Sequence, residues 1–261
     1  PALIEEVPAG STVIAYAALA ALRESPGVQQ LTAFAQPVQM DKDYIAFMNG
    51  TGFDYQRDLD RVVVAEGPAA SGSTMILAEG RFDRRKIEQY ALRSGKLQLE
   101  NGRAVFVVPS DTPGKAIRFT FVTADRVALS SGGDLSSLEA ANAAPTLDAA
   151  MRERLSRVAG APVFAVLNSS TFTKGAQANG TLNPGVASQL QSLRWISLAA
   201  QPNTNDMLLS IEGECDRPED AQRVAGMLEL MRGIFRGAMA DPKARGRMPA
   251  ESADATVKLL D

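Results

Sequence analysis

The sequence predicts an α+β fold of two duplicated ferredoxin-like (split βαβ) units with antiparallel sheets, the first unit with extra hairpin strands. The first observation is an internal repeat: residues 59–65 and 193–199 begin similar series of segments, 134 residues apart. A Glu-Gly-x-x-Asp-Arg sequence follows each, from Glu79 and from Glu212, 133 residues apart. The second observation is the order strand, helix, strand, strand, helix in each half, which is that of a split βαβ unit. The third is a hydrophobic content of 45% with 22% charged residues, enough to bury a core.

Each element of the first half has a local signal. Runs of apolar residues predict strands, and apolar residues at helical spacing predict helices. Residues 67–73, rich in Gly, Ser and Ala, suit a hairpin loop, and Asn101-Gly102 is a strong two-residue hairpin turn. Asp83 is placed to cap a helix. The expected strands are 12–17, 61–66, 74–81, 96–100, 104–108, 117–123 and 126–130, and the expected helical stretches are 19–34, broken at 25–27, 44–48 and 83–93.

The second half shows fewer strands and the clearest helix. Asp216 lies three residues before Glu219, a capping-box spacing, and apolar residues from Ala221 to Ala238 fall on one helical face. A helix at 147–158, strands at 162–167, 193–199 and 207–211, and a polar loop at 168–180 complete this half. We therefore expect domains at 1–145 and 146–261. One continuous sheet shared by both halves is the alternative.

Composition excludes several classes of chemistry. The chain has no histidine, which removes Ser-His-Asp and Cys-His catalysis and histidine-ligated metals. The single Cys215 excludes an intrachain disulfide and is expected to be a buried small apolar residue. Net charge is −3, with 14 Lys/Arg against 17 Asp/Glu in residues 1–145 and 13 against 13 in 146–261. No clustered positive surface of the kind that binds nucleic acid is predicted.

The densest carboxylates are Asp54, Asp58 and Asp60. Such a run offers oxygen ligands for calcium, but its spacing matches no calcium loop, and Arg57 and Arg61 supply charge partners. A helical turn capped by Asp54 and leading into the strand at 61–66 explains these residues more simply.

Other candidate motifs also have structural explanations. Pro113-Gly-Lys115 is expected to be a hairpin turn, because a phosphate loop would need a following Ser/Thr and a helix. Residues 130–136 are expected to be a turn that caps a short helix. Glu79 and Glu212, close to Asp83 and Asp216, lie where a strand gives way to a helix, so capping and turn formation account for both pairs. The basic clusters at 81–86 and 243–247 are of ordinary size for solvated charge. We assign no catalytic, cofactor-binding or metal-binding residue and expect no cofactor.

Residues 7–16 (Val-Pro-Ala-Gly-Ser-Thr-Val-Ile-Ala-Tyr) and 52–62 (Gly-Phe-Asp-Tyr-Gln-Arg-Asp-Leu-Asp-Arg-Val) resemble uncharacterised exported proteins of soil bacteria. The resemblance covers mostly residues 7–90. It implies an extracytoplasmic location, in the periplasm or cell envelope, with residues 1–10 as a polar lead-in after a removed signal peptide or lipoprotein segment. That segment is also the expected route of any membrane anchoring.

The function expected from the sequence is a non-catalytic envelope module for binding or scaffolding. Its expected partner is another protein or a second copy of the chain. Two alternatives stay open. One is an enzyme that uses carboxylates with Ser or Lys, drawn from Asp54, Asp58, Glu79 and Lys174. The other is a subunit of a homo-oligomeric or membrane-anchored assembly.

Overall fold

The computed structural model describes residues 2–26, 42–67, 72–110, 115–133, 135, 138, 147–171, 173, 192–203, 206–226, 229 and 233. Its helices are η1 (Ala2–Glu6), α1 (Leu19–Arg23), α3 (Lys42–Thr51), α4 (Tyr55–Asp58), α5 (Arg84–Ala91) and α7 (Ala149–Val158). Its strands are β1 (Val13–Ala17), β2 (Leu59–Glu66), β3 (Thr74–Gly80), β4 (Lys96–Glu100), β5 (Arg103–Pro109), β6 (Ala116–Phe121), β7 (Arg126–Ser131), β8 (Val163–Asn168), β9 (Leu193–Asn203) and β10 (Asp206–Cys215).

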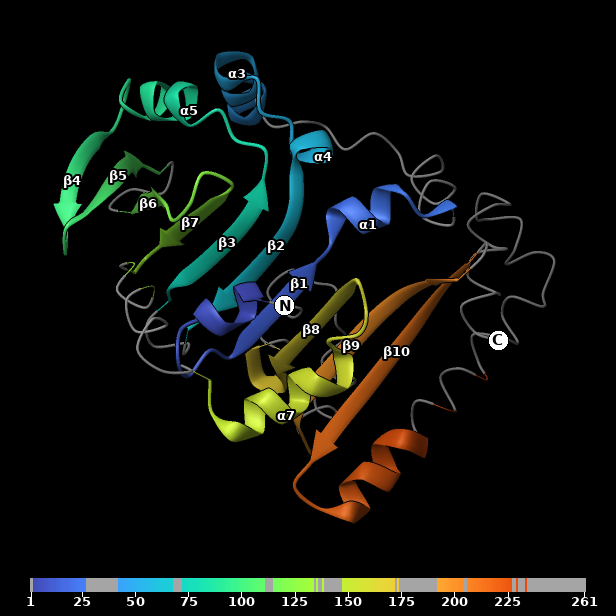
Figure 1. The fold of residues 1–261 in the computed structure, drawn as a ribbon. Helices are drawn as coiled ribbons and strands as arrows, with labels where there is room; N and C mark the ends of the chain where they lie inside the picture. The colour runs from blue at the N-terminus through green and yellow to red at the C-terminus, as the bar shows by residue number, and fades with distance from the viewer. Residues whose placement is uncertain are drawn as a thin grey trace. The chain divides into compact units, whose positions relative to one another are not determined.

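The chain divides into two compact units. One consists of Pro1–Arg23 with Pro37–Val166, and the other of Glu24–Gln36 with Leu167–Asp261. In the first unit, β1, β2, β3, β7, β6, β5 and β4 lie side by side in that order, and each pairs antiparallel with its neighbours (Figure 1). The chain therefore runs from β3 through α5 to β4 at the sheet edge, and then returns strand by strand to pair β7 with β3.

The two faces of this sheet are covered to different extents. On one face, which we call the covered face, the side chains are buried across the sheet: Ile14, Tyr16, Val63, Ala65, Met75, Leu77, Ala128, Val105 and Val107. Segment η1 lies against this face, because its Glu6 pairs with Arg126 of β7, and its neighbours Leu3, Ile4 and Val7 are fully buried. Within the expected lead-in at residues 1–10, Leu3, Ile4 and Val7 are thus buried, whereas Glu5, Ala9 and Gly10 are exposed.

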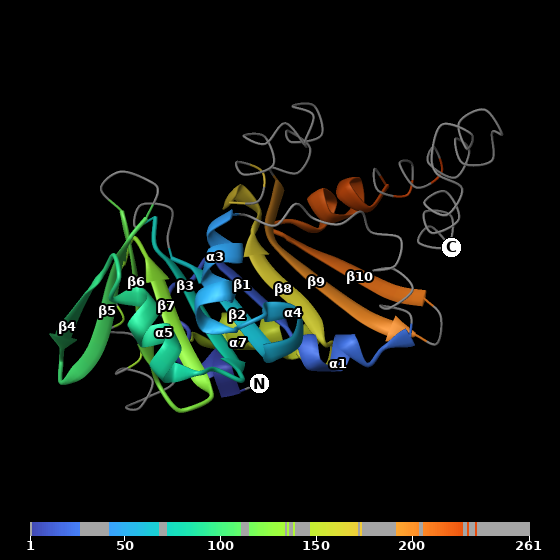
Figure 2. The same cartoon turned by 90° about the horizontal axis from the view of Figure 1, so that it is seen from above.

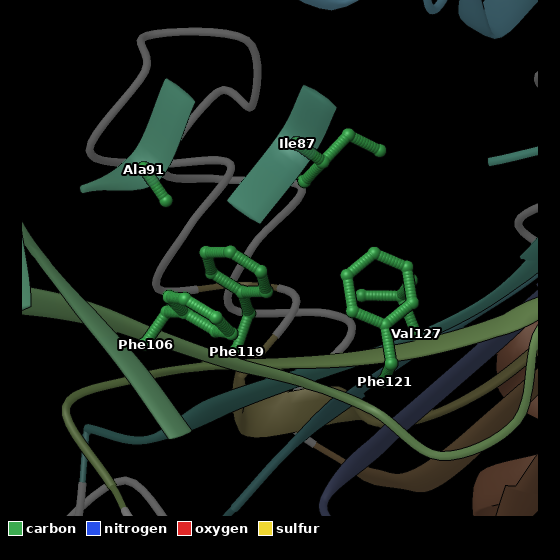
Figure 3. Packing of buried hydrophobic residues seen from close by; sticks show 6 residues of the cluster. All are labelled: Ile87, Ala91, Phe106, Phe119, Phe121 and Val127. Carbon is green, nitrogen blue, oxygen red and sulfur yellow. The ribbon is translucent and has the colours of Figure 1, made fainter. Parts of the chain in front are cut away.

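On the opposite face of the sheet, helix α5 packs over β5, β6 and β7 (Figure 2). Ile87 and Ala91 of this helix pack onto Phe106, Phe119, Phe121 and Val127 (Figure 3). The Phe106 and Phe119 rings stack with centroids 5.0 Å apart, and Phe119 meets Phe121 edge to face at 6.3 Å. Asp83 caps the helix as predicted, accepting a hydrogen bond from the Lys86 backbone N–H.

The second unit contains the hairpin of β9 and β10, followed by helical residues at 218–226. Val224 of that helical stretch is buried, whereas Leu208, Leu209 and Ile211 of β10 are exposed. Among the described residues of both units, no helix is long and apolar enough to cross a membrane.

The expectation of two duplicated ferredoxin-like units is wrong. The hydrogen-bonded strand order β10-β9-β8-β1-β2-β3-β7-β6-β5-β4 is that of one ten-stranded sheet, the arrangement named above as the alternative. A split βαβ unit needs helical crossovers between parallel strands. Here β1 pairs antiparallel with β2, so the helices between them form no crossover. Helix α5 does join β3 to the parallel strand β4, but β7, β6 and β5 all lie between these two strands, so the arrangement is not that of a ferredoxin-like unit.

The repeated sequence does not hold equivalent positions either. Glu79 lies opposite Arg61 in the β2–β3 pair, and the residue that corresponds to Arg61 in the repeat is Trp195. Glu212 instead lies opposite Ser197, two residues further along β9. The two hairpins have similar sequences and the same order of strand and turn, but their strands pair in different registers. The sequence similarity therefore does not define a duplicated folding unit.

Candidate functional site

The three aspartates that the sequence singles out lie at the start of β2. Asp54 accepts a hydrogen bond from the Gln56 backbone N–H at 2.9 Å and caps α4, as predicted. The Tyr44 hydroxyl lies 3.4 Å from the same carboxylate and accepts a hydrogen bond from the Tyr55 backbone N–H at 3.1 Å. Asp54 therefore joins α3 to α4.

Asp58 is the most enclosed of the three, with a side chain that is 10% exposed. Arg57 binds it in a bidentate manner, with Nε 2.9 Å from Oδ1 and Nη2 2.7 Å from Oδ2. The Asp54 backbone N–H donates to Oδ2 at 3.0 Å, and Arg81 approaches Oδ1 at 3.5 Å. The hydrogen bonds from Arg57 are the main cause that lowers the pKa of Asp58 to about 2, and they outweigh the opposing effect of its burial.

The end of β3 closes this cluster from the other side. The Arg81 backbone N–H donates to the Asp58 carbonyl at 2.8 Å, and its guanidinium donates to the Arg57 carbonyl. Gly80 lies so close that a Cβ there would overlap the Asp58 carbonyl oxygen. The start of β2 and the end of β3 are thus held together at a point that only glycine fits.

Asp60 serves a separate connection. Arg23 of α1 donates to Asp60 at 2.9 Å, to the Leu59 carbonyl at 2.7 Å and to the Gln56 carbonyl at 3.1 Å. Asp60 is therefore not a third member of an Asp54–Asp58 site. Within the described residues no group of three or more Asp, Glu, Cys or His side chains is arranged to hold a metal ion.

Glu79 occupies the centre of a row of charges on the covered face. It lies directly opposite Arg61 of β2 and Arg126 of β7. Arg61 contacts its Oε2 at 3.0 Å, and Arg126 donates to its Oε1 from both Nε and Nη2. Arg126 also pairs with Glu6, so the row fastens η1 to the sheet. Glu79 stands out in the sequence, whereas Arg126 and Glu6 do not, because their pairing depends on a strand register that the sequence does not reveal.

These contacts define what the carboxylates can do chemically. A general acid or base acts best with a pKa near the working pH, and Asp58 with a pKa of about 2 is ionised far below neutrality. Its oxygens, like those of Glu79, are already hydrogen-bonded to arginines. The geometry therefore assigns both residues to joining strands and helices.

The remaining sequence candidates lie apart from these clusters. Glu212 is exposed on β10, Asp216 pairs with Arg194 at 3.0 Å, and Cys215 is half-buried instead of fully buried as expected. Lys115 leads directly into β6, which pairs antiparallel with β5. In the first basic cluster Arg81 lies near Asp58, Arg84 pairs with Glu88 and Lys86 pairs with Asp83. Lys174, Asp134, Pro113, Gly114 and residues 243–247 lie outside the described residues.

A feature that the sequence analysis did not identify lies on the face opposite the charges. Ala15, Val64, Ile76 and Leu129 are aligned across β1, β2, β3 and β7, and all four are half-buried. We call these four residues the apolar row. It continues into Phe119 and Phe106, which α5 covers. The signal in the sequence was the absence of polar residues at alternate positions of 62–65 and 75–78, where a strand with one solvated face would carry them.

Comparisons with known proteins add little to this description. No protein-family model matches the chain, and no curated protein matches it. A crystal structure of TP0453 (crystal form I) is similar over 82% of this chain and 79% of that chain, with a TM-score of 0.48 and 10% sequence identity. A likeness at that level carries no argument about function.

Proposed function

We propose that this protein is a non-catalytic binding or scaffold module of the cell envelope that presents one face of its sheet to an apolar ligand. The apolar row carries the proposal. Four aligned apolar side chains on adjacent strands stay half-buried, while the apolar side chains on the other face of the same strands, such as Ile14, Val63 and Leu77, are buried. Contiguous accessible apolar surface of this kind is typical of binding surfaces.

The arrangement of the carboxylates supports a binding role over the enzyme alternative. Asp54 caps a helix, Asp58 binds two arginines, and Glu79 binds two more. Each of these groups has a structural partner that a substrate would have to displace.

The envelope location rests on the resemblance of residues 7–16 and 52–62 to exported bacterial proteins. Cell fractionation of the protein expressed from its complete gene tests this part. Recovery in the cytoplasmic fraction alone would contradict it.

A neutral apolar fluorophore, N-phenyl-1-naphthylamine, tests the binding face directly. We expect its fluorescence to rise on titration with the full chain, and Ile76→Ser and Val64→Ser to weaken binding about fivefold or more, because each removes apolar contact area. Thr74→Ser is the matched control, since Thr74 lies two residues from Ile76 on the same face of β3 and is already polar. Circular dichroism and urea midpoints confirm that each variant is folded.

Two outcomes would contradict the proposal. The first is probe binding that stays the same in both serine variants. The second is hydrolysis of a substrate from a broad panel that Asp58→Asn or Glu79→Gln abolishes while the variant stays folded.

A further inference from the structure

Strand β4 ends the sheet of the first unit, and its side chains are distributed unusually for an edge strand. In the strand order β4 has β5 on one side and no strand among the described residues on the other. Leu97 and Leu99 are 52% and 78% exposed, although both lie on the face where Phe106 and Phe119 form a core. Leu92, at the C-terminal end of α5, is exposed as well. An uncovered edge with apolar side chains is a template for pairing with another strand.

The sequence of β4 is complementary to itself in the antiparallel sense. It reads Lys96-Leu97-Gln98-Leu99-Glu100. When two copies are paired antiparallel about Gln98, Lys96 of each copy lies opposite Glu100 of the other, and Leu97 lies opposite Leu99. Directly opposed unlike charges and apolar pairs are the contacts that stabilise adjacent strands.

Other registers lack this agreement. A slip by one residue places leucines opposite polar side chains, because successive side chains point to opposite faces. Pairing about residue 96 opposes lysine with lysine, and pairing about residue 100 opposes glutamate with glutamate. Pairing about 97 or 99 opposes like leucines but leaves the charges without opposite partners. Only pairing about Gln98 matches both faces of the strand.

We propose that β4 is a self-association surface, through which two copies of this chain join antiparallel across a twofold axis at Gln98. A twofold interface uses the same patch on both subunits, so each contact occurs twice. The pair extends the apolar surface of Leu97 and Leu99 into the second copy. Arg118 contacts Oε1 of Glu100 on the face of β4 that also carries Lys96. It therefore adds positive charge to the face on which the partner copy's Glu100 carboxylate would lie.

A five-residue strand pair buries less than a standard interface, so the expected association is weak, about 10 μM to 1 mM. Lysine at an edge normally discourages pairing with foreign strands. In this arrangement Lys96 excludes strands that lack an acidic residue opposite it and accepts a second copy of β4. The surface is thereby selective for self-association.

Sedimentation velocity of the full chain between about 5 and 500 μM tests the proposal. We expect the average mass to rise from the 27.7 kDa of one chain toward twice that value. Lys96→Glu opposes two acidic residues at each end and should weaken association about tenfold or more. Leu99→Ser should weaken it as well. The matched control is Leu208→Ser, which removes an exposed leucine from β10 and should leave association unchanged.

Mixing two variants gives the sharper result. Lys96→Glu and Glu100→Lys should each associate poorly alone, whereas an equimolar mixture should associate as the unsubstituted chain does, because every charge then meets its opposite. Urea midpoints control for the loss of the Arg118 contact in Glu100→Lys. A Gln98→Cys variant in a Cys215→Ser background should form a disulfide-linked dimer when oxidised glutathione is added as the oxidant, because residue 98 of one copy lies directly opposite residue 98 of the other.

Three results would overturn the proposal. One is a chain that stays monomeric over the whole concentration range, and another is association that Lys96→Glu and Leu99→Ser leave unchanged. The third is a mixture of the charge variants that associates no better than either alone. None of them bears on the apolar row, because probe binding to one chain does not require β4 pairing.

Discussion

Replacing Asp58 by asparagine tests whether its ion pairs stabilise the fold. The pKa of Asp58 falls from its ordinary 3.8 to about 2 in the folded chain, which corresponds to about 2.4 kcal/mol of folding free energy at neutral pH. Arg57 and Arg81 are 65% and 63% exposed, so solvent screening reduces this contribution to about 1–2 kcal/mol. Because folding lowers this pKa, the contribution is complete above pH 3.8 and is lost as the pH falls through 2.

Urea denaturation of the unsubstituted chain and of Asp58→Asn, at pH 7 and in steps down to pH 2, measures this contribution. We expect the variant to be less stable by about 1–2 kcal/mol at pH 7 and the difference to shrink toward zero at pH 2, where the native carboxyl is also largely protonated. Asp216→Asn is the control, since its ion pair with Arg194 is well exposed and should contribute little. Equal stability at pH 7, or a deficit that is independent of pH down to 2, would refute this reasoning.

Three further substitutions probe the packing of the first unit by urea denaturation. Gly80→Ala should cost about 2–4 kcal/mol, because the new Cβ overlaps the Asp58 carbonyl, whereas Gly160→Ala meets no atom within 4 Å and should change stability by less than about 0.5 kcal/mol. Phe119→Ala should cost about 3–5 kcal/mol, since it empties the centre of the cluster under α5, and a loss below 1 kcal/mol would contradict that packing. Arg126→Met should cost about 2–4 kcal/mol and expose η1 to proteolysis, because it removes the partner that Glu6 and Glu79 share; unchanged cleavage near η1 would show that buried apolar residues alone hold it.

Local signals in the sequence predicted most elements of the first unit. Asp54 and Asp83 cap helices because a side-chain oxygen satisfies a backbone N–H within three residues, which needs no long-range information. Asn101 and Gly102 both adopt positive φ, as the predicted turn between β4 and β5 requires. The strands expected at 96–100 and 126–130 agree with β4 and β7 within one residue.

Strand pairing was beyond the reach of these signals. The residues between β1 and β2 and between β3 and β4 include helices, and helices between strands suggested crossovers of a ferredoxin-like unit. Helix α5 does connect the parallel strands β3 and β4, but β4 lies at the sheet edge with three strands between them, and Ile87 and Ala91 pack on phenylalanines that follow later in the sequence. The similar hexapeptides at Glu79 and Glu212 likewise predict the local order of strand and turn, but they do not predict the register in which the strands pair.

The same register explains what the charged residues that stand out in the sequence do in the fold. Charged residues are the usual candidates for function in a sequence. In the fold, however, Asp58, Glu79 and Arg126 lie where strand ends or η1 are held together, and each forms an ion pair with a residue of opposite charge. Val64 and Ile76 look like ordinary strand residues, but alignment across four strands turns them into a surface that the described fold leaves half-covered. Completing that coverage would add roughly 25 cal/mol per Å² of apolar area removed from water. A ligand that covers the row would gain that free energy, which is the physical basis of the proposed binding.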